Sequence, residues 1–320
     1  MKAIVCTRYG DPLEVLQLKE VDKPVPTEGR VLVRVHAASV NKADLAPVRG
    51  AIVARLLGTG LLKPKRAILG DDLAGTVEGV GKDVTRFKPG DEVFGDAPGA
   101  FAEYASASQD LLVSKPANVS FEEAAAVPIA AISALQGLRK AHIQAGQKVL
   151  VNGASGGVGT FALQIAKSFD TQVTAVCSSG NLENARAMGA DHVVDYTKED
   201  FSRNGQRYDL ILAANGDQPL RAYSRALTPQ GTCIVAGGSL TQIFQSLILG
   251  RWYSKSGGQT IAFMGIAELN QEDLAFLKEL LENCKIKPWI DRRYPLGETA
   301  RAVRYLEEGH ATGKVVINVK

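Results

Sequence analysis

The sequence predicts an α/β protein of two domains, one mostly β and the other built on a doubly wound parallel sheet. Residues 1 to about 115 contain short alternating runs, such as Val31–Val35 and Gly75–Val80, separated by turns rich in Gly and Pro. From about Phe121 to Ile266, helical and strand patterns alternate, which is typical of a parallel sheet with crossover helices. The length of 320 residues allows two separate cores.

The expected elements follow this division along the chain. The first part predicts a small β barrel or sandwich. A helical pattern then covers residues 121–141, and the apolar strand Lys148–Asn152 follows it. After a helix-like stretch over Gln271–Cys284, the chain ends with a helix from about Gly297 to Glu308 and a strand from Lys314. We expect this tail to return to the first domain.

Composition and charge exclude several classes of partner. The net charge of +3, from 37 basic and 34 acidic residues, gives no field that would favour nucleic acid or an anionic membrane. The start MKAIVCTRYGD lacks the apolar core of a signal peptide, and no window approaches the length of a membrane span. Cys6, Cys177, Cys233 and Cys284 are far apart, so we expect free thiols and a cytoplasmic protein.

The segment KVLVNGASGGVGTFALQIAKSF, residues 148–169, predicts a dinucleotide site. A buried strand leads into Gly153, Gly156, Gly157 and Gly159, and an amphipathic helix follows. Glycine permits the tight turn and a close approach to a pyrophosphate, and the helix N-terminus offers free amides. The alternative is a strand-to-helix turn that only packs closely, but the next strand, Gln172–Val176, also fits the binding motif.

The end of that next strand favours NADPH over NADH. An NAD site usually places an acidic residue there, whereas this chain has Cys177, Ser178 and Ser179. The absence of a carboxylate leaves room for a 2′-phosphate, and Arg186 and Lys198 are candidate cations. Alternatively, the serines only cap a helix that starts near Asn181.

Six blocks of the chain together resemble the zinc-free quinone oxidoreductase branch of the medium-chain dehydrogenase/reductase superfamily, which also contains enone reductases. They are ILGDDLAGTVEGVGKDVTRFKPGDEVFG, GAFAEYA, AAAVPIAAISALQGL, VNGASGGVG, AMGADHVVDY and GHATGKVVI. Their order and spacing agree over nearly the whole chain. The resemblance implies hydride transfer from NADPH to a quinone or an α,β-unsaturated carbonyl compound.

The resemblance also implies an organisation and a set of cofactor contacts. It implies a GroES-like domain over residues 1–120 and 287–320, a Rossmann domain over residues 121–286, and a homodimer joined edge to edge near Thr260–Met264. Relatives often have an arginine or lysine near Gly180, and its absence weakens the NADPH assignment. The expected cofactor contacts are Ser133, Gly153, Ser155, Gly156, Gly157, Val158, Gly159, Ser178, Ser179, Tyr196, Asn215, Gly237, Gly238 and Lys314.

No metal is expected. Zinc relatives have a cysteine where this chain has the stretch 41–44 and a His-Glu pair where it has Asp71 and Asp72. The four histidines, His36, His142, His192 and His310, have no ligand spacing. Asp71, Asp72 and Asp91 could be a cluster for a hard cation, but the adjacent glycines favour turns.

Without zinc, hydrogen bonds must stabilise the charge that develops on the substrate oxygen, and a conjugated acceptor demands least of them. Asn41 is the candidate polariser, and a turn-forming role is its alternative. Several relatives carry tyrosine or lysine where this chain has Ala46. The proton donor therefore stays open among solvent, the cofactor ribose, Lys42 and Tyr104.

Two mixed segments, Val48–Arg66 and Leu240–Tyr253, are expected to form pocket walls or a lid, with contact to a lipid surface or a partner as the alternative. Two competing functions remain. One is a dinucleotide-binding regulator or RNA-associated protein with little turnover, against which the chain has no basic stripe with aromatics. The other is a zinc-free alcohol dehydrogenase acting on simple substrates.

Overall fold

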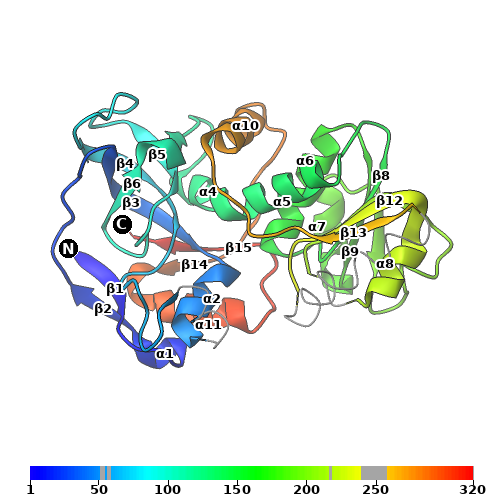
Figure 1. Ribbon diagram of the computed structural model, residues 1–320, viewed down its shortest axis with the longest axis horizontal. Coiled ribbons are helices and arrows are strands. Elements are labelled where there is room, and N and C mark those ends of the chain that lie inside the picture. The colour runs from blue at the N-terminus through cyan, green and yellow to red at the C-terminus, as the bar shows by residue number, and fades with distance from the viewer. Residues whose placement is uncertain (51–54, 56–58, 216–217, 239–257, 320) are drawn as a thin grey trace. The chain divides into compact units, whose positions relative to one another are not determined.

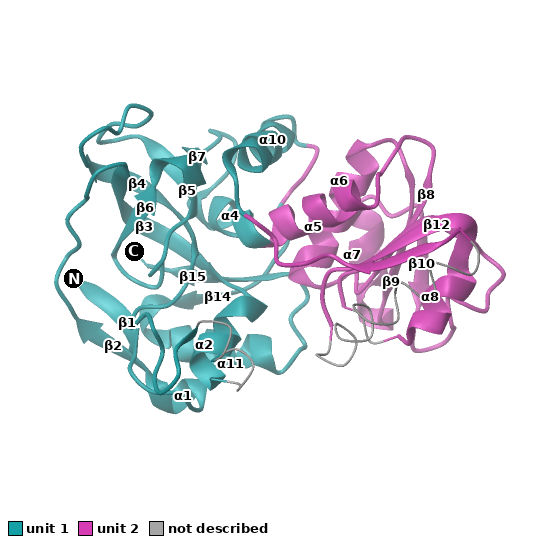
Figure 2. Ribbon diagram, viewed as in Figure 1, with its two compact units in different colours: residues 1–129, 269–284, 288–320 teal, residues 130–268, 285–287 magenta. Residues whose placement is uncertain are grey.

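The chain folds into two compact units, each described here by itself. The computed structural model describes residues 1–50, 55, 59–215, 218–238 and 258–319. Unit 1 contains residues 1–129, 269–284 and 288–320, and unit 2 contains residues 130–268 and 285–287 (Figure 2). The last segment of the chain, residues 288–320, therefore belongs to unit 1 together with the first 129 residues.

Unit 1 is built mainly from antiparallel strands (Figure 1). Its larger sheet has the order β14-β15-β3-β4-β5-β7, with β6 paired to β3. The strands of this sheet are β3 (Arg30–Val40), β4 (Asp72–Val80), β5 (Glu92–Asp96), β6 (Tyr104–Ser108), β7 (Leu112–Ser114), β14 (Ile290–Pro295) and β15 (Lys314–Asn318). A separate pair consists of β1 (Lys2–Cys6) and β2 (Leu16–Glu20).

The register of β3 brings distant segments to one place. Ser39, near the end of β3, lies opposite Asp72, the first residue of β4. On the other side of β3, Val40 lies opposite Val315, which follows Lys314 at the start of β15. Three polar residues from separate segments of the chain, Asn41, Asp72 and Lys314, therefore gather at the end of β3.

Short helices and a large apolar cluster complete unit 1. Alternate valines of β3, Val31, Val33 and Val35, are buried with Leu73 and Phe101. Most helices of the unit have fewer than ten residues, so packing rather than helix propensity must stabilise them. They are α1 (Pro12–Val15), η1 (Lys42–Asp44), α2 (Leu45–Arg49), η3 (Gln109–Leu111), α4 (Phe121–Ala125), α10 (Gln271–Glu282), η5 (Leu296–Glu298) and α11 (Thr299–Glu307).

The described part of unit 2 contains a six-stranded sheet whose neighbouring strands are all parallel. Its order, β10-β9-β8-β11-β12-β13, is that of a doubly wound Rossmann fold, which confirms the fold class predicted from the sequence. The strands are β8 (Lys148–Asn152), β9 (Gln172–Cys177), β10 (His192–Asp195), β11 (Tyr208–Ala213), β12 (Leu227–Val235) and β13 (Thr260–Phe263). The helices are α5 (Pro128–Lys140), α6 (Gly157–Ser168), η4 (Ser179–Asn181), α7 (Leu182–Ala187) and α8 (Leu220–Ala226).

Two details differ from the sequence expectations. The helix predicted over residues 121–141 is divided into α4 and α5, because Pro128 lacks an N–H and disfavours helical geometry in the residue before it. Residues 121–129 and 269–284 belong to unit 1, whereas the sequence assigned them to the dinucleotide-binding domain. Helix α10 packs against β7, and Asn118 Nδ2 donates to Leu281 O at 3.0 Å.

The helices of the described chain give no sign of a membrane span: none of them has the length together with the apolar character that crossing a bilayer requires.

Candidate cofactor and active site

The turn after β8 accepts only glycine at two positions. Gly153 has a φ of +82°, and a Cβ there would lie 2.5 Å from Asn215 Cβ. A Cβ on Gly159 would lie 2.1 Å from the carbonyl oxygen of Gly153. At Gly156, by contrast, an added Cβ would meet nothing closer than 3.7 Å. Gly153 and Gly159 therefore allow the turn to close. Gly156 leaves open space beside the backbone of the turn, where a ligand could bind.

The N-terminus of α6 follows this turn and is suited to an anion. Gly156 occupies the N-cap without a side-chain cap, and no acidic residue lies in the first turn. The amides of Gly157, Val158 and Gly159 precede the first intrahelical bond, from Thr160 N to Gly156 O at 2.9 Å. Such amides, together with the helix dipole, bind phosphate groups. The half-buried Ser155 lies in the same turn.

The turn lies at the point where the order of the sheet reverses, between β8 and β11. Asn152 at the end of β8 donates its side-chain amide to Asn215 O at 3.0 Å and to the Tyr223 hydroxyl at 2.9 Å. The exposed Asn215 lies two residues after the end of β11, and Gly237, which lies two residues after the end of β12, donates its N–H to the carbonyl oxygen of Ala213, the last residue of β11. Ligands of doubly wound sheets bind at this edge. The structure thus brings together the predicted residues Gly153, Asn215, Gly237 and Gly238.

The end of β9 has a carboxylate on the neighbouring strand. Ser179 Oγ donates to Asp195 Oδ2 at 2.5 Å, and Thr197 donates to Asp195 Oδ1 from both its N–H and its hydroxyl. These hydrogen bonds hold the pKa of Asp195 well below its usual range. Lys198 Nζ lies 3.3 Å from the same carboxylate. Asp195 therefore stays ionised beside the two serines.

Four other residues that the sequence predicts to contact or attract the cofactor differ in their partners and in their burial. Ser178 is at the N-cap of η4 without a capping bond, and its hydroxyl accepts from Asn181 Nδ2 at 2.9 Å. Arg186, one of the two candidate cations, forms an ion pair with Glu183 at 2.7 Å. Tyr196 is exposed, and Ser133 is buried on α5.

Lys314 belongs to unit 1, where its ammonium group is buried in a polar cluster. The side chain is 3% exposed, and its Nζ lies 2.5 Å from Asn41 Oδ1 and 3.4 Å from Asp72 Oδ2. Burial lowers the pKa of Lys314, while the negative charge of Asp72 acts in the opposite direction. The sequence predicted Lys314 as a cofactor contact, and nothing in its position pointed to this cluster.

Asp72 is the centre of the same cluster and is completely buried. Its Oδ2 accepts from Ser39 Oγ at 2.9 Å and from Asn41 Nδ2 at 2.8 Å, and its Oδ1 accepts from Ile129 N at 3.0 Å. Both ends of the Asn41 amide are therefore held in one orientation. An amide nitrogen has two hydrogens, and the bond to Asp72 uses one of them.

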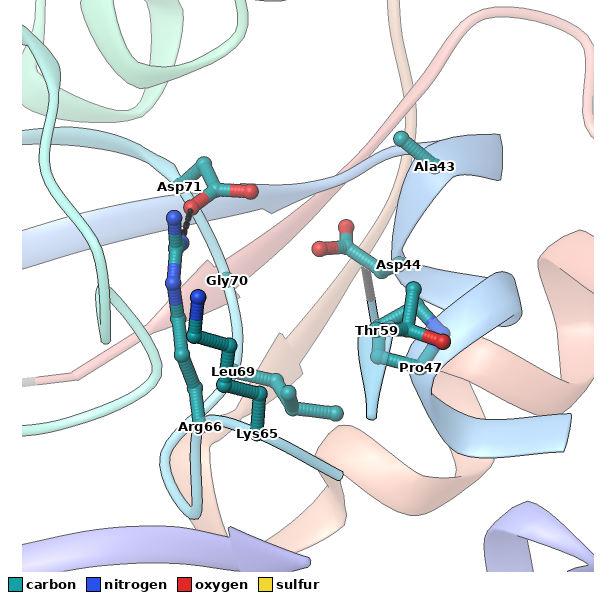
Figure 3. A pocket seen from close by; sticks show the side chains of 9 residues that line it. All are labelled: Ala43, Asp44, Pro47, Thr59, Lys65, Arg66, Leu69, Gly70 and Asp71. Carbon is teal, nitrogen blue, oxygen red and sulfur yellow. Dashed lines mark hydrogen bonds and ion pairs between the residues drawn. The ribbon is translucent and has the colours of Figure 1, made fainter. Parts of the chain in front are cut away.

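A cavity of about 300 Å³ lies beside this cluster within unit 1 (Figure 3). Two carboxyl groups, those of Asp44 and Asp71, point toward one another in it. Arg66 Nη1 lies 2.8 Å from Asp71 Oδ1. Burial, followed by the negative charge of Asp71, raises the pKa of Asp44 to about 8. The lining residues are Ala43, Asp44, Pro47, Thr59, Lys65, Arg66, Leu69, Gly70 and Asp71.

Part of one segment that was expected to form a pocket wall lines this cavity. Three residues of the segment Val48–Arg66, namely Thr59, Lys65 and Arg66, do line it. Residues 51–54 and 56–58 of that segment, and all of Leu240–Tyr253, lie outside the described residues. Sequence reasoning missed Asp44; its one available signal was the spacing of three residues from Asn41, which allows a bond between the Asn41 N–H and Asp44.

The described side chains offer no group of three His, Cys, Asp or Glu residues that could hold a metal ion. At the two positions where zinc relatives have a His-Glu pair, Asp71 is paired with Arg66 and Asp72 contacts Lys314. His36 is stacked on Phe121, with ring centroids 4.2 Å apart, and its Nε2 lies 3.1 Å from Thr76 Oγ1. These contacts do not resemble a zinc site, which uses thiolates and imidazoles.

The glycine turn at the reversal point of unit 2 defines a dinucleotide-binding protein. Family models agree with both parts of the fold: "Alcohol dehydrogenase GroES-like domain" matches residues 27–117, and "Zinc-binding dehydrogenase" matches residues 188–317. The chain belongs to the medium-chain dehydrogenase/reductase superfamily of oxidoreductases, as its sequence motifs predict.

Named relatives and solved structures cover nearly the whole chain. A 2-methylene-furan-3-one reductase of Solanum lycopersicum is 34% identical over 99% of this chain and 79% of its own length. The chloroplastic NADPH-dependent alkenal/one oxidoreductase of Arabidopsis thaliana is 32% identical with the same coverage. The structure of the quinone oxidoreductase from Coxiella burnetii has a TM-score of 0.87 and 31% identity, covering 100% of this chain and 99% of that one.

Proposed function

We propose that this protein transfers hydride from NADPH to a quinone or an α,β-unsaturated carbonyl compound, without zinc. The observation that carries the proposal is the turn Gly153–Gly159, whose open face and free helix amides fit a pyrophosphate. The class of acceptor is supported by relatives named quinone oxidoreductase, alkenal/one oxidoreductase and 2-methylene-furan-3-one reductase.

NADPH, when bound, supplies the hydride. The roles of the protein are then to hold the dinucleotide and to stabilise the acceptor oxygen. In unit 2, the amides of residues 157–159 would bind the pyrophosphate, and Asn215, Gly237 and Gly238 would follow the cofactor along the carboxyl edge of the sheet. In unit 1, Lys314 and Asp72 orient the Asn41 amide, whose second N–H is the expected polariser of the acceptor.

The preference for NADPH over NADH rests on two arguments. The residues at the end of β9 include no carboxylate that would repel a 2′-phosphate. One relative is itself named as NADPH-dependent. The ionised Asp195 on the neighbouring strand acts against this preference, and Lys198 partly offsets its charge.

Independence from zinc is supported by the chemistry of the residues in unit 1. Lys314 already supplies a positive charge between Asn41 and Asp72, and a metal ion near that position would be repelled by the ammonium group. The cavity offers two carboxyl groups but no histidine or cysteine among the described residues that line it, whereas catalytic zinc sites include histidine, together with carboxylate or cysteine in some of them.

Two further expectations belong to the same proposal. Strand β13 is the last strand in the order of the described sheet, and association of two copies through this strand would form the expected homodimer. The described cysteines are free, and Cys284 is exposed, which fits a reducing compartment such as the cytoplasm.

The test is an assay of NADPH oxidation, and separately of NADH oxidation, with quinones, linear enones and saturated aldehydes. We expect turnover of quinones or enones with NADPH that is unchanged by a chelator. Tight NADPH binding without turnover of any acceptor would instead identify a dinucleotide-binding regulator. Loss of activity with chelator, restored by zinc, would refute the zinc-independent mechanism.

A further inference from the structure

Asp44 combines burial with access to a cavity. It is the last residue of η1, it is 4% exposed, and it lines the cavity of about 300 Å³ in unit 1. The backbone N–H of Asn41 donates to Asp44 Oδ2 at 2.7 Å. Because Oδ2 accepts this bond, a proton on the carboxyl group would reside on Oδ1.

The surroundings of Asp44 favour its neutral form. Two carboxylates, Asp71 and Asp72, act on it together with burial, and Lys314 is the opposing cation of the cluster. Lys65 and Arg66 are the other charged residues that line the cavity, and Arg66 is paired with Asp71. Burial in a group with two like charges keeps a carboxyl protonated, so Asp44 is a carboxylic acid at neutral pH.

We propose that Asp44 is the proton donor of the reduction, delivering its proton to the oxygen of an acceptor in this cavity. The inference rests on the proposed function. Hydride adds to the β-carbon of the enone, the C=C pair forms a new double bond to the carbonyl carbon, and the C=O pair moves to the oxygen. That oxygen takes the proton from Asp44 to give an enol. The enol rearranges to the saturated ketone, and the Asp44 carboxylate regains a proton from solvent. A quinone would give the hydroquinone by the same single proton transfer.

The other candidates for this role have less suitable positions. Lys42 is exposed and is not among the residues that line the cavity. Tyr104 lies on β6 and is not among the residues that line the cavity; the Nζ of Lys23 lies 3.8 Å from the centroid of its ring. Asp71 also lines the cavity and burial raises its pKa, but its ion pair with Arg66 acts in the opposite direction, and among the described residues Asp44 has no such cation bonded to its carboxyl group. Asp44 is the lining residue that combines a cavity position with a stable proton.

A purely structural role for Asp44 is the competing account. Its carboxyl group receives the Asn41 N–H at the start of η1, as a capping residue does. A capping role predicts a loss of stability when the group is removed, but no effect on the pH dependence of turnover. The two accounts are therefore separated by a pH profile.

The test is Asp44→Asn, which keeps an oxygen for the Asn41 N–H but has no acidic proton. In wild type, we expect kcat for an enone to fall above pH about 8, where Asp44 ionises. In Asp44→Asn, we expect kcat to fall about 10²- to 10⁴-fold and this alkaline decrease to disappear. Asp96→Asn is the matched control, because Asp96 also has a raised pKa, about 7, and does not line the cavity.

Asp71→Asn gives a second measurement that does not remove Asp44. Since the charge of Asp71 raises the pKa of Asp44, its removal should move the alkaline decrease to lower pH. Unchanged urea unfolding followed by circular dichroism, together with unchanged NADPH affinity in a fluorescence titration, would show that both units of the variants are folded. Active wild type with an Asp44→Asn variant of equal kcat and unchanged pH profile overturns this inference alone. Wild type that binds NADPH but reduces no acceptor overturns the proposed function, and Asp44 as its proton donor with it.

Discussion

Replacing Lys314 with methionine should strongly destabilise unit 1. Methionine keeps much of the length of the side chain and removes the ammonium group, which lies 2.5 Å from Asn41 Oδ1 and 3.4 Å from Asp72 Oδ2. Both charged side chains are buried, Lys314 at 3% and Asp72 at 0% exposure. The substitution therefore leaves a carboxylate inside the protein without its cation.

The magnitude follows from the partners that remain. Removing one member of a buried ion pair costs about 3–5 kcal/mol, because the other charge is left uncompensated. Asp72 would still accept hydrogen bonds from Ser39, Asn41 and Ile129, which partly solvate it. We therefore expect the lower end of the range, about 3 kcal/mol, as the decrease in the free energy of unfolding.

A double-mutant cycle measures this effect directly. Lys314→Met, Asp72→Asn and the double variant would be unfolded in urea and followed by circular dichroism. We expect a coupling energy of about 1–3 kcal/mol, with the double variant more stable than the sum of the single effects predicts. Effects that add to within about 0.5 kcal/mol would refute the description of Lys314 and Asp72 as a coupled pair.

Two further predictions concern the glycine turn and the stability of the cavity. Gly159→Ala places a Cβ 2.1 Å from Gly153 O and should therefore weaken NADPH binding at least about tenfold, as measured by fluorescence titration. Gly79→Ala is the control: the space around its Cβ is open, so NADPH binding should not change. Asp44 has a folded-state pKa of about 8, above its unfolded value near 3.8, so folding takes up a proton between these limits. Relative to Asp44→Asn, the free energy of unfolding of wild type should therefore decrease by up to about 1.4 kcal/mol for each pH unit as the pH rises through this range. Unfolding both proteins at pH 5, 6, 7 and 8 would measure the difference.

The fold and the glycine turn could be predicted from the sequence because both depend on local patterns. Alternation of strands and helices determines a parallel sheet, and the resulting strand order is that of the dinucleotide-binding fold. The glycines of the turn are required by backbone geometry, as the close contacts at Gly153 and Gly159 demonstrate. One local signal was overlooked: Pro128 begins a new helix, α5, and so interrupts the single helix predicted over residues 121–141.

The polar cluster of unit 1 could not be predicted in the same way. Asn41 follows β3, Asp72 begins β4 and Lys314 begins β15, so the three residues are far apart in sequence and only the register of β3 with β4 and β15 brings them together. The titration behaviour of Asp44 depends on burial and on the charge of Asp71, neither of which a residue type reveals. The position of Asn41 after a strand, compared with relatives, therefore made it a candidate polariser, but gave no sign of its partners.

The cluster also limits the acceptors that unit 1 can serve. Lys314 brings a positive charge close to Asp72, but an ammonium group has only donors and cannot accept an electron pair as a metal ion does. The hydrogens of Lys314 are directed to Asn41, Asp72 and the Val40 carbonyl. Charge on an acceptor oxygen must then be stabilised by hydrogen bonds and by proton transfer. A saturated aldehyde concentrates that charge on one oxygen, whereas an enone or a quinone spreads it over a conjugated system. We therefore expect turnover with conjugated acceptors to exceed turnover with saturated aldehydes, in proportion to how well each acceptor delocalises the charge.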